Sequence, residues 1–185
     1  MIGVQKRHDR FAAASRAQAF VLLQRGRRPL GFVRRRAGGE RVTLLITRRL
    51  TARLLNALAS LLERSNPRAR QAPSPLRGDV VLIEHQAAIQ APSRTTLAPS
   101  GPVSGAPPRH LLPPALLTAV DVRNRASHFS LAFRDARQPL VACDLTRVEL
   151  HRVVQLMLTK VTEAGWGISV DASWLGLEQQ SVTIN

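Results

Sequence analysis

The chain has 185 residues, of which 44% are hydrophobic, and a formal net charge of +15. This length allows one domain with its own core or two very small domains, and the apolar fraction excludes a chain that is disordered throughout. No apolar run is long enough to span a membrane, and the single cysteine, Cys143, excludes an intramolecular disulfide and favours a reducing, cytoplasmic location.

The positive charge is concentrated in the first part of the chain. Residues 1–77 contain 18 Lys and Arg against three acidic residues, whereas residues 78–185 contain nine of each kind. A codon bias toward arginine would explain the scarcity of lysine, but it would act on both parts alike. We therefore expect an acidic partner for the first part, most often nucleic acid.

An internal repeat is indicated by a shift of 99 residues, which aligns Phe32–Ser65 with Leu131–Ala164 without a gap. The shift pairs Thr47 with Thr146 and Arg48 with Arg147. Chance similarity between two amphipathic segments is the alternative interpretation. Because polar positions agree as well as apolar ones, the pattern favours a duplicated unit of three strands and a helix.

The first unit, residues 17–65, follows a basic N-terminal tail at residues 1–16. Alternation predicts strands at Phe20–Arg25, Leu30–Arg35 and Arg41–Ile46, with a turn at Gly38-Gly39. A helix is predicted to start after Thr47, since leucines then recur at helical spacing.

Arginines crowd the two ends of the hairpin formed by the first two of these strands. Arginine forks match the geometry of phosphate oxygens, and the scarcity of aromatic residues argues against stacking on unpaired bases. We therefore predict contact mainly with the phosphate backbone, with a merely solvated hairpin as the alternative. The predicted nucleic-acid-binding residues are Arg25, Arg27, Arg28, Arg34, Arg35 and Arg36.

Residues 66–116 are rich in Pro, Ser and Ala, which predicts a long connecting loop without a packed core. One apolar island, residues 79–84, is interpreted as a possible strand. The part from Gln86 to Pro114 is expected to be mobile.

The second unit, residues 117–165, is predicted to contain strands at Ala119–Arg123, Phe129–Arg134 and Leu140–Cys143. Thr146 and Glu149 form a capping-box pattern at the start of its helix, and Gly165 would end it.

Apolar residues cover more than one stripe of that second helix, which is expected to be buried on two sides or to meet a partner. A C-terminal strand and tail, residues 166–185, is predicted to follow. The candidate interface for a protein partner or a second copy comprises Val153, Met157, Trp166 and Trp174.

The sequence contains no phosphate-binding glycine loop, no metal-ligand spacing and no nucleophile motif, so no enzyme, metal or cofactor is predicted. Asp121, His128, Asp135 and Asp144 are the candidates for a metal-dependent nuclease site, the least favoured alternative, because their spacing is not diagnostic. His151 is interpreted as an ordinary, partly exposed histidine.

The sequence thus predicts an α+β protein: a duplicated β-β-β-α unit, with antiparallel sheets and helices packed on one face. The favoured function is a non-catalytic binding protein whose basic N-terminal half contacts nucleic acid or a nucleoprotein complex. The alternative is a protein-interaction subunit that docks through the second helix and the tryptophan-containing C-terminus. No membrane partner is expected.

Overall fold

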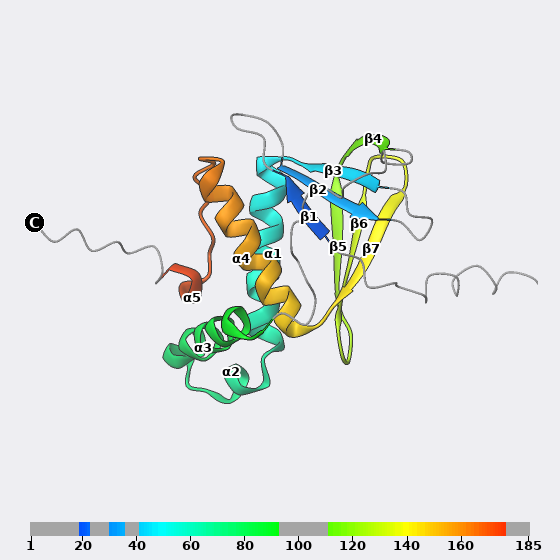
Figure 1. Ribbon diagram of the computed structural model, residues 1–185. Coiled ribbons are helices and arrows are strands. Elements are labelled where there is room, and N and C mark those ends of the chain that lie inside the picture. Colours follow the sequence, from blue (N-terminus) through cyan, green and yellow to red (C-terminus); the bar gives the residue numbers. More distant parts are fainter. Residues whose placement is uncertain (1–18, 23–29, 36–40, 93–110, 177–185) are drawn as a thin grey trace, which may run out of the picture.

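The computed structural model describes residues 19–22, 30–35, 41–92 and 111–176, with side chains described from residue 43 onward in this set and, after the gap, from residue 113 to 175. These residues form an α+β fold in which two β-sheets lie beside a group of helices (Figure 1). The order of strands and helices along the chain follows the predicted order over both units. The α+β prediction is confirmed, whereas the duplication itself stays a prediction.

The first sheet has the strand order β1-β2-β3-β4. Its strands are β1 (Ala19–Leu22), β2 (Leu30–Arg35), β3 (Arg41–Ile46) and β4 (Leu111–Leu116). The first three are antiparallel, but β4 pairs parallel with β3, so the expectation of purely antiparallel sheets is wrong. Pro113 and Pro114 fit into β4 because it is an edge strand, and the register with β3 is irregular at that point.

The second sheet is an antiparallel meander of β5 (Ala119–Asn124), β6 (Phe129–Arg134) and β7 (Pro139–Leu145). Asp135 forms the predicted turn between β6 and β7, since its carboxylate accepts hydrogen bonds from the backbone N–H groups of Arg137 and Gln138. All three predicted strands of this unit are confirmed.

The two long helices, α1 (Arg48–Ser65) and α4 (Arg147–Glu163), begin where the N-terminal caps predict, and α4 also ends as predicted. Thr47 Oγ1 accepts from Leu50 N, and Thr146 and Glu149 form the complete capping box. Gly165, with a φ of 64°, takes the left-handed conformation that ends α4.

The prediction of a connecting loop at residues 66–116 is wrong over much of that range. This range contains α2 (Pro67–Gln71), a short 3-10 helix (Ser74–Leu76) and α3 (Arg77–Gln90), as well as β4. Proline does not prevent these helices because Pro67 occupies the first turn of α2, where its missing N–H is not needed. The part of the loop at residues 93–110 lies outside the described residues.

The possible strand at residues 79–84 belongs to α3 and is a second correction. The run of apolar residues suggested β structure, but helical spacing places Val81, His85 and Ala88 on one buried face. A short apolar run does not distinguish a strand from a buried helix.

The predicted C-terminal strand at 166–170 is wrong as well. This segment has no regular secondary structure and joins neither sheet, and it leads to α5 (Ser173–Gly176). Its backbone bonds instead to the side chain of Asn56, which donates to Ser169 O and accepts from Asp171 N. The alternation of more and less buried residues in this segment therefore arises from packing along α1 and not from pairing with a strand.

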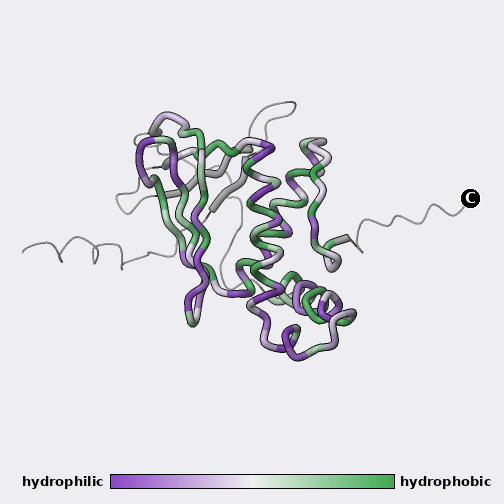
Figure 2. Tube along the Cα trace, turned by 180° about the vertical axis from the view of Figure 1, so that it is seen from behind, coloured by the Kyte–Doolittle hydropathy of each residue, from purple (hydrophilic) through white to green (hydrophobic). Residues whose placement is uncertain are grey.

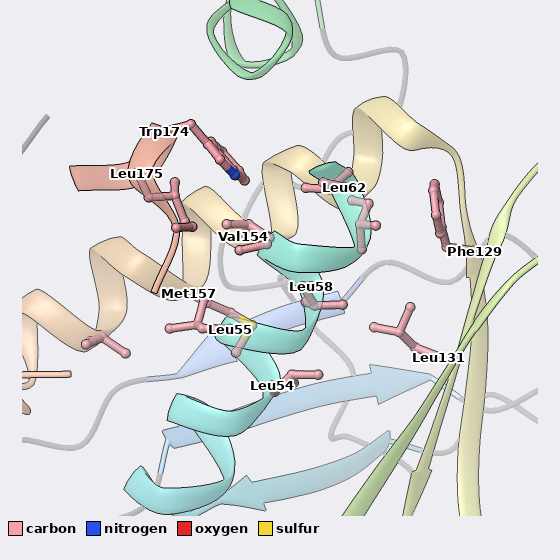
Figure 3. Packing of buried hydrophobic residues seen from close by; sticks show 14 of the residues in the cluster. Leu54, Leu55, Leu58, Leu62, Phe129, Leu131, Val154, Met157, Trp174 and Leu175 are labelled. Atoms are coloured by element: carbon pink, nitrogen blue, oxygen red, sulfur yellow. The ribbon is translucent and has the colours of Figure 1, made fainter. Parts of the chain in front are cut away.

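One hydrophobic cluster joins the two sheets and the helices. Figure 3 shows α1 at its centre, with leucines directed toward α4 on one side and toward the strands on the other. Figure 2 shows the complementary pattern along the chain, in which the short segment around α2 is mostly hydrophilic. The labelled core residues are Leu54, Leu55, Leu58, Leu62, Phe129, Leu131, Val154, Met157, Trp174 and Leu175.

Candidate functional site

Most of the arginines predicted to bind nucleic acid lie outside the described residues. Arg34 and Arg35 are in β2, opposite Val42 and Arg41 of β3, while Arg25, Arg27, Arg28 and Arg36 are not described. Their role in binding stays a prediction.

A second group of arginines, which the sequence analysis did not single out, lines a hollow of about 170 Å³ where three helices meet. Arg64 comes from the end of α1, Arg70 from α2 and Arg77 from the start of α3. We call these three residues the arginine hollow. Glu63 and Ala69 complete its lining.

The geometry of the arginine hollow follows from the local sequence. Asn66 ends α1 and caps α2, because its side-chain oxygen accepts from Ala69 N at 2.9 Å. Pro67 then starts α2 in a new direction, and the buried Ala69 holds that helix against the core. The end of α1, all of α2 and the start of α3 are therefore brought together within fifteen residues.

The hollow has an excess of positive charge. Within the described residues none of its three arginines forms an ion pair, and Glu63 is the only carboxylate in the lining. Arg77 Nε donates to Ala72 O at 3.3 Å, and its terminal nitrogens form no hydrogen bond with the described part of the chain. Three exposed guanidinium groups around a hollow of this size can surround a phosphate group.

A polar cluster of a different kind lies inside the molecule, between α3 and α4. His85 and His151 are both fully buried, and their Nδ1 atoms are 3.1 Å apart. The Nε2 of His85 is 3.1 Å from Gln155 Oε1, and the Nε2 of His151 is 3.4 Å from Glu84 Oε2, an ion-pair distance. The expectation of a partly exposed His151 is wrong, because α3 covers this face of α4.

Arg147 connects this cluster to α1. Its guanidinium donates to both carboxylate oxygens of Glu84, to Ser65 Oγ at 2.7 Å and to Leu62 O at 2.6 Å. The Arg147 side chain, at the start of α4, thus forms hydrogen bonds with the end of α1 and with the middle of α3.

The charge of Glu84 is strongly stabilised. Burial alone would raise the pKa of this carboxyl, but hydrogen bonds and charge from His151 and Arg147 lower it to about 2. Asn66 also donates to Glu84 Oε2 at 2.7 Å, and Asn66 is the residue that caps α2. The carboxylate therefore links the buried cluster to the helix that carries Arg70.

The residues predicted to contact a protein partner lie largely in the chain's own core. Met157, Trp166 and Trp174 are at most 6% exposed, and Val153 is half-buried against the same core. Trp174 packs its ring against both histidines of the α3–α4 cluster, with ring centroids 5.1 Å from His85 and 6.0 Å from His151. A partner role for these four residues stays a prediction, without support from this arrangement.

The candidate nuclease residues have separate local contacts. Asp121 is 3.6 Å from Arg134, His128 is 3.7 Å from Asp144, and Asp135 is occupied in its turn. Among the described residues, no group of three or more His, Cys, Asp and Glu side chains is arranged to hold a metal ion. Over the same part of the chain, no helix combines the length and apolarity needed to cross a membrane.

The sequence analysis did not identify the buried cluster, because its members come from segments that are far apart along the chain. His85 and His151 are 66 residues apart, and His85 lies in the segment interpreted as a linker. The helical spacing of Val81, His85 and Ala88 was the only available signal, and it indicates burial without naming the partner. No family model, curated protein or solved structure was found that matches the chain.

Proposed function

We propose that this protein is a non-catalytic binding protein whose basic N-terminal half contacts the phosphate backbone of nucleic acid. The observation that carries the proposal is the arginine hollow: Arg64, Arg70 and Arg77 come from three helices, face one space and have no ion-pair partner among the described residues. A folded protein that brings three guanidinium groups together without a carboxylate for each of them gains stability when an anion binds there.

The distribution of charge supports the same proposal. Arg64, Arg70 and Arg77 lie within the first 77 residues, which contain 18 basic and three acidic residues. The arginines of the predicted hairpin belong to the same part of the chain, so both groups add to one basic region of the sequence. Such a region binds phosphate without reading bases, and its affinity depends steeply on salt.

The experiment is a fluorescence anisotropy titration of labelled duplex DNA and of single strands, from about 50 to 200 mM salt. The triple variant Arg64→Gln, Arg70→Gln, Arg77→Gln removes the charge of the hollow. Each phosphate contact contributes about −0.9 to the slope of log affinity against log salt on duplex DNA, so we expect this slope to flatten by about 2 to 3. The loss should be alike for all duplex sequences.

The matched control removes the same charge from the neutral half. Arg123, Arg125 and Arg137 are exposed and lie on the second sheet or its turns, and their change to Gln should leave the salt slope nearly unchanged. Equal losses in the two triple variants would mean that net charge acts at long range and that the hollow is not the site. Absence of binding by the unmodified protein at low salt would overturn the proposed function.

The predicted hairpin is tested by a third variant, Arg34→Gln, Arg35→Gln, Arg36→Gln. We expect it to flatten the salt slope by about 2, independently of the hollow, because the two groups would contact different phosphates. An unchanged slope would restrict binding to the hollow.

We also propose that the two strand-helix units arose by duplication. In support, β2 pairs with β3 and β6 with β7 in the same register after the shift of 99, since Phe32 faces Leu44 and Leu131 faces Cys143. Buried positions of the helices agree too: Thr51, Leu55, Leu58 and Leu62 correspond to Leu150, Val154, Met157 and Val161. The first pair of strands differs by two residues in register between the units.

A further inference from the structure

The buried contact between His85 and His151 has hydrogen-bond requirements that fix its protons. Gln155 Oε1 is an acceptor, so the His85 Nε2 that faces it carries a hydrogen, and the Nδ1 of a neutral His85 then has only a lone pair. The Nδ1 of His151, 3.1 Å away, must therefore be the donor of the contact between the rings. The other nitrogen of His151 faces the carboxylate of Glu84, which only accepts hydrogen bonds.

The contact between the rings requires that one of the two facing Nδ1 atoms carries a hydrogen and that the other has a lone pair. The Nε2 of His151 lies 3.4 Å from Glu84 Oε2 but makes no hydrogen bond within the described residues. The charged groups near the pair include Glu84 of α3 and Arg147 of α4, while Gln155 of α4 and Trp174 of α5 contribute neutral side chains.

Protonation of both rings would break the arrangement. Both facing Nδ1 atoms would then carry a hydrogen, and two positive rings would be in contact inside the protein, where their charges repel.

The attachment of α3 combines apolar and polar contacts. Of its fourteen residues Val81 and Ala88 are buried apolar residues and Val80 and Leu82 pack against the core as partly buried residues, whereas Ile83 is 66% exposed. The polar contacts with α4 include the Glu84–Arg147 pair, the histidine contact and the bonds that Arg152 donates to Ala88 O and Ala91 O. A charge change at the histidines therefore acts in the middle of a helix that polar contacts help to hold on α4.

We infer that the His85–His151 contact is a pH-sensitive switch, which holds α3 on α4 while one of the two facing Nδ1 atoms lacks a proton and releases α3 when both rings are protonated. Because Arg77 of α3 lines the arginine hollow, release separates it from Arg64 and Arg70 and weakens the anion site. This consequence for binding rests on the proposed function, whereas the release itself does not.

The release is measured on the full chain without nucleic acid. In a Trp166→Phe background Trp174 is the only tryptophan, and its emission reports the environment between the two histidines. Between pH 8 and pH 5, where histidines titrate, we expect a cooperative red shift of this emission and at least about tenfold faster amide exchange in α3.

Two single variants test the origin of that transition. His85→Gln keeps a donor and an acceptor but cannot be protonated, so the transition should disappear. His128→Gln, which removes a partly exposed histidine near Asp144, should leave it unchanged. A transition with the same midpoint in His85→Gln would overturn the inference.

Nitrogen chemical shifts of the unmodified protein provide a test that does not depend on a variant folding. At pH 8 only one of the two facing Nδ1 atoms should carry a proton, and at pH 5 both rings should be protonated on both nitrogens. Release of α3 without protonation of both rings, or protonation of both rings at pH 5 with α3 still protected from exchange, would overturn the inference. Anisotropy at constant pH 8 tests nucleic-acid binding separately, so the two proposals fail in different experiments.

Discussion

The helices α1 and α4 occupy the same place in the two strand-helix units, yet they use their arginines differently. Arg53 of α1 is exposed, whereas Arg152 at the corresponding position of α4 donates to two carbonyls at the end of α3. Arg48 makes one bond, to Gly167 O at 3.3 Å, whereas Arg147 joins three helices. The helices α1 and α4 share their sequence pattern, but α3 packs on α4, so the arginines of α4 form their contacts within the fold.

This contrast gives the charge asymmetry of the sequence a physical meaning. Basic residues of the second half are engaged in internal contacts: Arg134 pairs with Asp121, Arg147 with Glu84 and Lys160 with Glu163. Arginines on the helices of the first half extend into solvent, and within the described residues they form no ion pair. Within the described residues, ion pairs thus engage part of the basic charge of the second half, whereas the arginines on the helices of the first half keep their charge available to a partner.

The largest expected effect concerns the apolar positions, at which the two helices should behave alike. Met157 and the corresponding Leu58 are both buried in the shared core. Met157→Asp and Leu58→Asp would each bury a carboxylate without a partner and should each prevent folding, at a cost of several kcal/mol. Circular dichroism and thermal unfolding provide the measurement, and a variant that melts like the unmodified protein would show that its position is not part of the core.

The next effect separates the two helices. Arg147→Ala removes four hydrogen bonds and leaves the half-buried Glu84 without its main cation, so we expect a loss of about 3 kcal/mol in the free energy of unfolding. Arg48→Ala removes one exposed bond and should change this free energy by less than about 0.5 kcal/mol. Denaturant titrations of the two variants measure the difference, and equal losses would remove the contrast between α1 and α4.

The smallest effect is the pH dependence due to Glu84, measured in the His85→Gln variant so that the histidine transition is absent. The pKa of Glu84 is lowered from 4.5 to about 2 in the folded protein. The stabilisation is therefore fully present above pH 4.5 and is lost as the pH falls toward 2. Because the side chain is 32% exposed, we expect about 1–2 kcal/mol after solvent screening.

The control for this effect adds Glu84→Gln to the same variant. The acid-induced loss between pH 4.5 and pH 2 should then become smaller by the amount that Glu84 contributed. If the two proteins lose stability in parallel over this range, the carboxylate is not stabilised by Arg147 and His151 as the distances indicate.

The sequence by itself determined the six strands of the two units, the two long helices and their caps. Those features depend on neighbours within a few residues: alternation in β6, the Thr146–Glu149 box, and the left-handed Gly165. It also determined the charge asymmetry, which requires only counting. The proline content of residues 66–90 led to the wrong prediction of a loop there, because Pro67 starts a helix instead of interrupting one.

Only the tertiary structure decided which surfaces meet. The contacts of α3 with α4 join residues more than 60 positions apart, so no periodicity within either segment could identify His85 as the partner of His151. The same holds for β4, which crosses to pair parallel with β3, and for the arginine hollow, whose members become neighbours only after Asn66 turns the chain. Local pattern selects the elements, whereas the choice of partners depends on which faces remain to be buried once these elements have formed.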